Sequence, residues 1–199
     1  MKFVLATKNA HKITEIKHKF AAIKDLEMLS LDEIAGDAPD VVEDGVTFEE
    51  NAMLKAKAIS EFTGLPAMAD DSGICIDAMD GQPGIFSARY GGYDTPDAEK
   101  NAMILQELEG KENRNAHYEC AIAIVFPDGQ NDVSIGKCEG LIAKALSGSN
   151  GFGYDPIFFL PEYGCTMAEI SLEEKNRISH RARALDKAFK SLENILHEK

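Results

Sequence analysis

The chain has 199 residues, of which 44% are hydrophobic and 28% are charged. This length and composition suit a domain with a sizeable core, and they exclude a disordered, collagen-like or coiled-coil chain. The 34 acidic residues outnumber the 21 basic ones, which gives a formal net charge of −13. Such a charge argues against a protein that binds nucleic acid or an anionic membrane by neutralising phosphates, but a local cationic pocket or a metal could still hold a small anion.

The N-terminus predicts a strand followed by a helix. Lys2–Ala6 is a short apolar run with polar residues after it, and apolar residues at positions 13, 16, 20 and 23 then recur at the spacing of one helix face. The apolar run is too short for a signal peptide, and no run approaches the roughly 20 residues that span a bilayer. We therefore expect a cytoplasmic protein.

An acidic loop and a capped helix come next. Residues 35–46 combine acidic residues with Gly and Pro, which is typical of a loop. Thr47 and Glu50 have the spacing of a capping box, so a helix should follow them and end at Gly64.

Short elements fill the middle of the chain. Pro66–Met68 and Ile74–Ile76 are strand candidates on either side of a polar centre. Thr95 and Pro96 are residue types preferred at the N-cap and at the first position of a helix, so a helix should begin there.

The C-terminal half predicts a hairpin and a last helix. His117–Phe126 and Val133–Cys138 are rich in β-branched and apolar residues and flank a Pro-Asp-Gly turn, as in an antiparallel hairpin. The last helix carries apolar residues on one face, at positions 182, 185, 189, 192 and 196. This mixture of helices and strands, with an antiparallel hairpin, predicts an α/β or α+β chain with a mixed sheet.

The four cysteines predict free thiols. Cys75, Cys120, Cys138 and Cys165 are spread along the chain without a CxxC pair. Disulfides are rare in the cytosol, and the paired spacing of a zinc site is absent, so we expect reduced, buried thiols.

The first candidate site segment is Thr7-Lys8-Asn9-Ala10-His11-Lys12, which joins the first strand to the first helix. Backbone N–H groups at a helix N-terminus favour an anion, and the ammonium of Lys12 would add a point charge. The segment lacks the glycines of a Walker loop. An ordinary capped turn with solvated lysines would explain it equally well.

The second candidate is Asp70-Asp71-Ser72-Gly73, between two apolar runs. Adjacent carboxylates repel each other, and a divalent cation is one way to offset that repulsion. Mg²⁺ typically takes one or two protein carboxylates, so the other carboxylate could accept a proton from water. The alternative is a solvated turn, because these residue types favour turns.

The third candidate is Glu43 together with Lys55 on the helix that follows. Glu43 lies in a loop that also contains Asp37, Asp40 and Asp44, so its sequence context does not distinguish it from a solvated acid. Lys55 shares its helix with other lysines and could equally be a surface residue.

The fourth candidate is Gly151-Phe152-Gly153-Tyr154-Asp155-Pro156, with Lys175 and Ser179-His180-Arg181 further on. Glycines let the backbone approach a ligand closely, and an aromatic ring can stack on a nucleobase. Ser179 suits a helix N-cap, but His180 and Arg181 are unfavourable in a first helical turn. A bound anion would resolve that conflict, whereas a glycine-rich turn followed by a capped helix is the simpler alternative.

In this order, the four segments resemble the inosine triphosphate pyrophosphatase family of enzymes, which cleanse the nucleotide pool. Each motif alone is weak, but the ordered set covers nearly the whole chain and is highly specific. The matching segments are Val4–Lys12, Thr47–Ala52, Ala69–Gly73, Pro83–Tyr90, Gly151–Pro156 and Ser179–Leu185.

The resemblance implies one domain over residues 1–199 with an elongated α/β fold. A long mixed sheet with flanking helices would form two lobes around a central cleft, as in the related Maf-like proteins. The resemblance further implies a homodimer that hydrolyses ITP, dITP and XTP to the monophosphate and pyrophosphate, by water attack at the α-phosphate. Mg²⁺ is the implied metal, and Mn²⁺ suits the same oxygen ligands. We expect no nucleic acid or membrane partner.

The resemblance also assigns residues to the phosphates. Thr7, Lys8, Asn9, Ala10, His11 and Lys12 would form the cradle for them. Lys55 and Lys175 would neutralise their charge, and Ser72 would contact the nucleotide.

The carboxylates are assigned to the metal and the water. Glu43 and Asp70 would hold Mg²⁺, and Asp71 would be the general base and could also touch the metal. Asp40 or Asp44 could substitute for Glu43, because the acidic loop is crowded. Which carboxylate is the base and which is the ligand stays open at this point, and some relatives have Glu where this chain has Asp70.

The base of the nucleotide would be held by the C-terminal segments. Phe152 would stack on it, and its edge would be read by hydrogen bonds that favour a 6-oxo over a 6-amino group. Such a site can discriminate by up to about 10⁴–10⁵-fold. Some relatives have Trp where this chain has Tyr154. Asp155, His180 and Arg181 would read the edge of the base or orient it, and Gly153 and Tyr154 would also bind the substrate.

Two other functions fit parts of the sequence. A Maf-like nucleotide pyrophosphatase would act on modified pyrimidines, but the Phe152 loop and Ser179-His180-Arg181 argue against it. A non-catalytic nucleotide sensor would tolerate loss of the carboxylates, yet Asp70, Asp71 and Lys12 are all present. Release of pyrophosphate separates the enzyme from the sensor.

Overall fold

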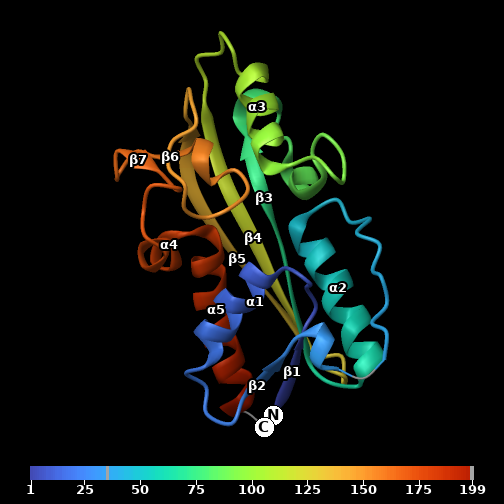
Figure 1. Ribbon diagram of the computed structural model, residues 1–199. Coiled ribbons are helices and arrows are strands. Elements are labelled where there is room, and N and C mark those ends of the chain that lie inside the picture. The colour runs from blue at the N-terminus through green and yellow to red at the C-terminus, as the bar shows by residue number, and fades with distance from the viewer. Residues whose placement is uncertain (35, 198–199) are drawn as a thin grey trace. The chain divides into compact units, whose positions relative to one another are not determined.

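The computed structural model describes residues 1–34 and 36–197. They form a seven-stranded mixed sheet with flanking helices, in the strand order β2-β1-β3-β4-β5-β6-β7 (Figure 1). β1 is parallel to β2 and β3, whereas β6 is antiparallel to β5 and β7, so the predicted α/β class with a mixed sheet is confirmed. The strands are β1 (Lys2–Leu5), β2 (Glu27–Leu29), β3 (Ala67–Ile76), β4 (Asn115–Val125), β5 (Asn131–Ile142), β6 (Phe158–Leu160) and β7 (Cys165–Thr166). The helices are α1 (Ala10–Phe20), α2 (Phe48–Thr63), α3 (Asp97–Glu107), α4 (Leu172–Ile178) and α5 (His180–His197).

The chain divides into two compact units. Unit 1 comprises Met1–Asp71, Cys120–Gly136 and Arg183–Lys199, and unit 2 comprises Ser72–Glu119 and Lys137–Ala182. Strands β3, β4 and β5 and helix α5 each contribute residues to both units. The assignment of residues 1–199 to one domain stays a prediction.

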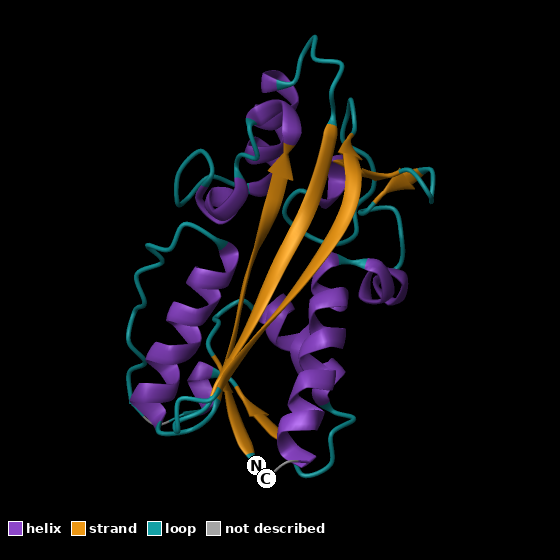
Figure 2. Cartoon of the chain, turned by 180° about the vertical axis from the view of Figure 1, so that it is seen from behind, coloured by secondary structure: helices purple, strands orange, loops and turns teal. Residues whose placement is uncertain are grey.

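Unit 1 has a core between the sheet and two helices. Figures 1 and 2 show α1 and α5 side by side on one face of the sheet, with α2 on the other face. This arrangement follows from right-handed crossovers, because the connections β1-α1-β2 and β2-α2-β3 run in opposite directions along the sheet. Each fully buried Phe, Leu or Ile contributes roughly 1.5–3 kcal/mol. The core side chains include Phe3, Leu5, Ile16, Phe20, Ile122, Leu185 and Leu192.

Unit 2 has its own core, built around α3 and the strand residues that face it. Ile104 and Leu108 pack among side chains of β3, β4, β5 and β6. The fully buried members include Ile74, Ile76, Ile157 and Phe158. This core supports the loop before β6, where the glycine-rich segment of the fourth candidate lies.

Several local predictions are confirmed. The Thr47 hydroxyl accepts the Glu50 N–H at 3.1 Å, and α2 ends at Gly64, whose φ of 67° is left-handed. The Ser179 hydroxyl accepts the Ala182 N–H at 3.1 Å, which places His180 and Arg181 in the first turn of α5 as expected. β4 and β5 are neighbours joined by a turn at residues 126–130, as a hairpin requires.

Other local predictions are wrong. Pro66–Met68 and Ile74–Ile76 are not two strands, because β3 continues through the polar centre between them. Turn-favouring side chains are tolerated there because the carboxylates have lysine partners on the packing helices. Pro96 is the N-cap of α3 rather than its first residue, and Ile23 lies beyond the end of α1.

The acidic loop agrees with expectation, whereas the expected burial of the cysteines is confirmed for Cys120 and Cys138 and is wrong for Cys75 and Cys165. Residues 36–46 contain no helix or strand, and residue 35, the first of the predicted loop, lies outside the described residues. The four cysteines are free thiols, two buried and two half-buried, and burial raises the pKa of the Cys75 thiol to about 11. No described helix has the length and apolar character needed to cross a membrane.

Candidate active site

The segment from Thr7 to Lys12 forms the N-terminus of α1. The Asn9 carboxamide oxygen accepts the N–H groups of His11 at 3.0 Å and Lys12 at 3.2 Å, and the Thr7 hydroxyl accepts the Asn9 N–H at 3.2 Å. Lys8, Asn9, Ala10 and His11 are exposed. The capped turn expected from the sequence is therefore present, and its exposed residues are accessible to a ligand.

Asp70 and Asp71 direct their carboxylates to different helices. Successive side chains of a strand point to opposite faces of the sheet. Asp70 pairs with Lys12 of α1 at 2.9 Å, and Asp71 pairs with Lys55 of α2 at 3.2 Å. In this structure the repulsion expected between adjacent carboxylates is therefore offset by one ammonium group on each face.

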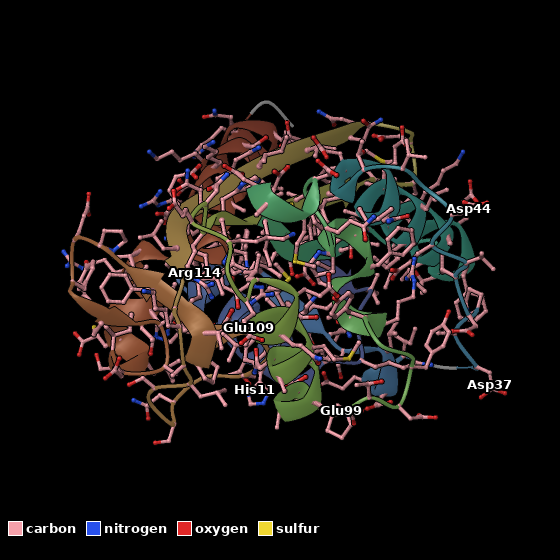
Figure 3. All side chains as sticks on the ribbon, turned by 90° about the horizontal axis from the view of Figure 1, so that it is seen from above. His11, Asp37, Asp44, Glu99, Glu109 and Arg114 are labelled. Atoms are coloured by element: carbon pink, nitrogen blue, oxygen red, sulfur yellow. The ribbon has the colours of Figure 1, made fainter. Side chains whose placement is uncertain are left out.

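Glu43 differs from the other acids of its loop. It is half-buried and pairs with Lys55 at 2.9 Å, whereas Asp40 and Asp44 are exposed. Figure 3 shows Asp44 at the outer edge of the loop. Lys55 therefore contacts both Glu43 and Asp71. This geometry favours Glu43 over its two neighbours as the acid that belongs to the site.

The electrostatics of this cluster suit a proton acceptor. Burial raises the pKa of Asp71, as does the charge of Glu43, while Lys55 and Lys12 lower it, and the net direction is upward. Burial lowers the pKa of Lys55, but the charges of Asp71, Asp70 and Glu43 outweigh it and raise that pKa. The Asp71 Oδ2 atom is buried and accepts no hydrogen bond from the described residues. A carboxylate with a free oxygen and a raised pKa is a better base than an ordinary one.

The same cluster offers oxygen ligands to a metal without forming a closed cage. Within residues 1–34 and 36–197, no three His, Cys, Asp or Glu side chains gather in a preformed cage. Mg²⁺ needs only one or two protein carboxylates when waters and substrate phosphates supply its other ligands. The free Oδ2 of Asp71 and the nearby Glu43 provide oxygen donors of that kind. These donors fit a hard divalent cation, and the set Glu43, Asp70 and Asp71 stays a prediction.

A second cluster, in unit 2, is centred on Asp155. Its Oδ2 atom accepts the Lys175 ammonium at 2.5 Å and the Phe152 N–H at 2.9 Å. Lys175 also lies over the Phe152 ring, with its nitrogen 4.4 Å from the ring centroid. Asp155 and Lys175 are only 2% and 5% exposed, so the ion pair is buried. Lys175 thus contacts the implied base-binding residues of its own unit.

His180 and Arg181 lie in the same cluster. The Arg181 guanidinium donates to the Ser72 hydroxyl at 3.0 Å and lies 5.8 Å from the Phe152 ring centroid. His180 stacks on the ring of Tyr118, with centroids 4.6 Å apart and planes inclined by 11°. The two basic residues of the first turn of α5 therefore have aromatic and hydroxyl partners rather than solvent.

The loop that carries Phe152 is hydrogen-bonded to residues of α3 that the sequence analysis does not predict as part of the site. Asp97 accepts the Gly153 N–H at 2.8 Å, and the Asn101 amide donates to the Gly153 carbonyl at 3.0 Å. The Tyr154 hydroxyl donates to the Ser87 carbonyl at 2.7 Å. Asp97 and Asn101 lie four positions apart on α3, so they share a face, but nothing in the sequence indicates what that face meets.

Gly151 provides a test of how closely this loop fits Asp155. Both Gly151 and Gly153 have a positive φ, of 76° and 63°, so alanine is strained by roughly 1–2 kcal/mol at either position. A Cβ on Gly151 would lie 2.0 Å from the Asp155 Oδ2, whereas one on Gly153 would meet nothing within 4 Å. We expect Gly151→Ala to destabilise the protein by about 1.5–3 kcal/mol more than Gly153→Ala, the size of a hydrogen bond to a charged group. Denaturant unfolding of the two variants measures the difference, and equal losses would contradict it.

The structure therefore gathers the predicted residues into separate groups. In unit 1, Glu43, Lys55 and Asp71 form one group, and Lys12 and Asp70 form an ion pair. In unit 2, one group contains Ser72, Phe152, Asp155, Lys175 and Arg181, linked through the contacts described above. His180 joins this group through Tyr118, whose hydroxyl donates to the Asp155 Oδ1 atom at 3.4 Å. Gly153 and Tyr154 form part of the loop that carries Phe152.

Known proteins are similar to this chain in sequence and in fold. The sequence pattern of the Ham1 family matches residues 3–191. The dITP/XTP pyrophosphatase of Geobacillus kaustophilus is 50% identical over 195 residues, covering 97% of this chain and 95% of that relative. The dITP/XTP pyrophosphatase of Geobacter sulfurreducens is 49% identical over 189 residues, covering 92% of each chain.

Solved structures agree with these matches. The Ham1 protein of Staphylococcus aureus is 39% identical and superposes with a TM-score of 0.90, over 98% of this chain and 99% of its own. A nucleoside-triphosphatase or dITP/XTP pyrophosphatase of Mycobacterium abscessus is 38% identical, with a TM-score of 0.79 over 94% and 98% of the two chains. The resemblance inferred from the ordered motifs is thereby confirmed: this chain belongs to the Ham1 family.

Proposed function

We propose that this chain hydrolyses dITP, ITP and XTP to the nucleoside monophosphate and pyrophosphate. The names of the relatives, at up to 50% identity over nearly the full length, support the reaction and the dITP and XTP substrates. The structural observation that carries the proposal is the buried Oδ2 atom of Asp71, which has no hydrogen-bond partner among the described residues and belongs to one group with Lys55 and Glu43.

Asp71 is the general base of this proposal. Its free Oδ2 accepts a proton from the water that attacks the α-phosphate, so the P–O bond to the leaving pyrophosphate breaks without a covalent enzyme intermediate. Lys12, Lys55 and Lys175 contribute positive charge against the triphosphate, and the Thr7–Lys12 segment supplies exposed N-terminal helix groups. Positioning and charge neutralisation are the main requirements of phosphoryl transfer.

Glu43, Asp70 and Asp71 are the residues that would hold a divalent cation. Mg²⁺ and Mn²⁺ both suit carboxylate oxygens. When bound, such a cation neutralises phosphate charge and lowers the pKa of a bound water.

The group around Phe152 is proposed to recognise the base. The Phe152 ring offers a stacking surface, and His180 and Arg181 carry donors for a 6-oxo group. A 6-amino group in the same place would set its own donor against a donor of the protein, so we expect ATP to be rejected. The homodimeric state implied by the sequence resemblance and the expected cytoplasmic location stay predictions.

A substrate panel tests the proposal. Pyrophosphate release is measured with Mg²⁺ from dITP, ITP, XTP, GTP, ATP and dUTP, each with and without EDTA. We expect metal-dependent release from dITP, ITP and XTP and little from ATP. Release from dUTP in preference to the purines would favour the Maf-like alternative. Binding of ITP without any release of pyrophosphate would contradict the proposed enzymatic activity and favour the non-catalytic nucleotide sensor.

A further inference from the structure

Tyr118 of β4 is a buried aromatic residue to which the proposed reaction gives no role. Its side chain is 6% exposed and lies in the core of unit 2. Two aromatic neighbours of this ring lie among residues 1–34 and 36–197. Phe158 is 4.5 Å away between centroids and tilted by 49°, whereas His180 is 4.6 Å away and nearly parallel at 11°. Only the contact with His180 has the geometry of a stacked pair.

The hydroxyl of Tyr118 contacts a second residue of the same group. It donates to the Asp155 Oδ1 atom at 3.4 Å, while the other carboxylate oxygen receives Lys175 and the Phe152 N–H. Burial, with the charge of Asp155 adding to it, raises the pKa of Tyr118 well above its usual range. The hydroxyl is therefore protonated, and stays a donor, throughout the neutral range. Tyr118 thus touches two residues that the proposed function assigns to the base.

We propose that Tyr118 is a positioning residue for base selectivity, which fixes the plane of the His180 ring by stacking and the Asp155 carboxylate by a hydrogen bond. This inference rests on the proposed function, because it needs His180 and Asp155 to face the base. Selectivity between a 6-oxo and a 6-amino group depends on where donors and acceptors point. Without the Tyr118 ring, the imidazole loses the stacked neighbour that sets its plane, and a donor that is less well positioned rejects the wrong base less well.

Three variants test the inference. Tyr118→Leu removes the stacked ring, Tyr118→Phe removes only the hydroxyl, and Phe158→Leu is a matched control. The control removes the ring of Phe158, which is the second aromatic neighbour of Tyr118 and belongs to the same core. For each variant, kcat and KM are measured for ITP and ATP, together with the thermal unfolding temperature.

The readout is the ratio of kcat/KM for ITP to kcat/KM for ATP. We expect Tyr118→Leu to lower this ratio at least about tenfold, mainly through a higher KM for ITP, and Tyr118→Phe to lower it about threefold. Phe158→Leu should lower the unfolding temperature and leave the ratio within about twofold of the wild type. If Tyr118 had a purely structural role, its replacement would lower kcat/KM for ITP and for ATP by the same factor.

The outcomes separate this inference from the proposed function. If the wild type does not distinguish ITP from ATP, the proposed function fails before any variant is compared. If the wild type distinguishes ITP from ATP and both Tyr118 variants keep the wild-type ratio, only the inference is overturned. If Tyr118→Leu does not fold, Tyr118→Phe decides alone, and an unchanged ratio in that variant overturns the inference.

Discussion

Replacement of Asp71 by Asn is expected to lower kcat for ITP hydrolysis by about 10²–10⁴-fold, which is the usual contribution of a general base. The carboxamide keeps the shape of the side chain but cannot accept a proton from the attacking water. Because Lys12 and Lys55 still provide positive charge, nucleotide affinity should change by less than about tenfold. Stopped assays of pyrophosphate release and calorimetric titration with nucleotide measure the two quantities separately.

The control for this variant is Asp44→Asn, which removes the same charge from the exposed part of the acidic loop. It should leave kcat close to the wild-type value, because Asp44 has no contact with Lys55 or Asp71 among the interactions of the described residues. Turnover by Asp71→Asn near the wild-type rate would remove Asp71 from the role of base. The general base would then be Glu43 or Asp70, the other two carboxylates of the predicted set.

The second large effect is expected on stability, at the buried pair of Asp155 and Lys175. Asp155→Leu leaves the Lys175 ammonium buried without its counter-ion and leaves the Phe152 N–H without its acceptor. Loss of one partner of a buried ion pair typically costs about 3–5 kcal/mol, and replacing both partners by apolar residues is often neutral. We therefore expect Asp155→Leu to lower the unfolding free energy by about that amount, and Lys175→Met in the same chain to recover most of it. Denaturant titration of the two single variants and the double variant gives the coupling energy.

A matched pair on the surface provides the comparison. Arg177 and Glu174 of α4 have the same 2.5 Å separation, but the Arg177 side chain is 71% exposed. Because solvent screens such a pair, Glu174→Gln should change the unfolding free energy little. If Asp155→Leu proves as mild as Glu174→Gln, the buried pair does not stabilise the loop that carries Phe152.

The sequence predicted those parts of the fold that depend on local chemistry. Helix α2 is the best example, because Thr47 caps its first turn and Gly64 supplies the left-handed residue at its end. Strand β3 was predicted as two pieces because Asp70 and Asp71 favour turns when considered locally. The partners that keep the chain extended there, Lys12 and Lys55, come from helices that precede it by many residues. Such long-range contacts have no local signal.

In the candidate site, too, contacts between residues that are distant in the sequence could not be predicted. The ordered motifs predict Phe152, Asp155, His180 and Arg181 as base contacts, and the structure brings these side chains into one group, His180 through Tyr118. Tyr118 was predicted only as part of a strand, because a single aromatic residue in an apolar run is usually core. The choice of Glu43 among several acids of its loop also needed the structure, which shows that Glu43 reaches Lys55.

The opposite directions of Asp70 and Asp71 constrain how this strand can change in length. Deleting or inserting one residue in β3 ahead of the pair would exchange their faces, so that each carboxylate would point away from its present lysine. A two-residue insertion would restore the faces but displace both carboxylates by about 6–7 Å along the sheet. Homologous chains should therefore show no gaps between Ala67 and Asp71, while the exposed loop of residues 36–46 can vary in length.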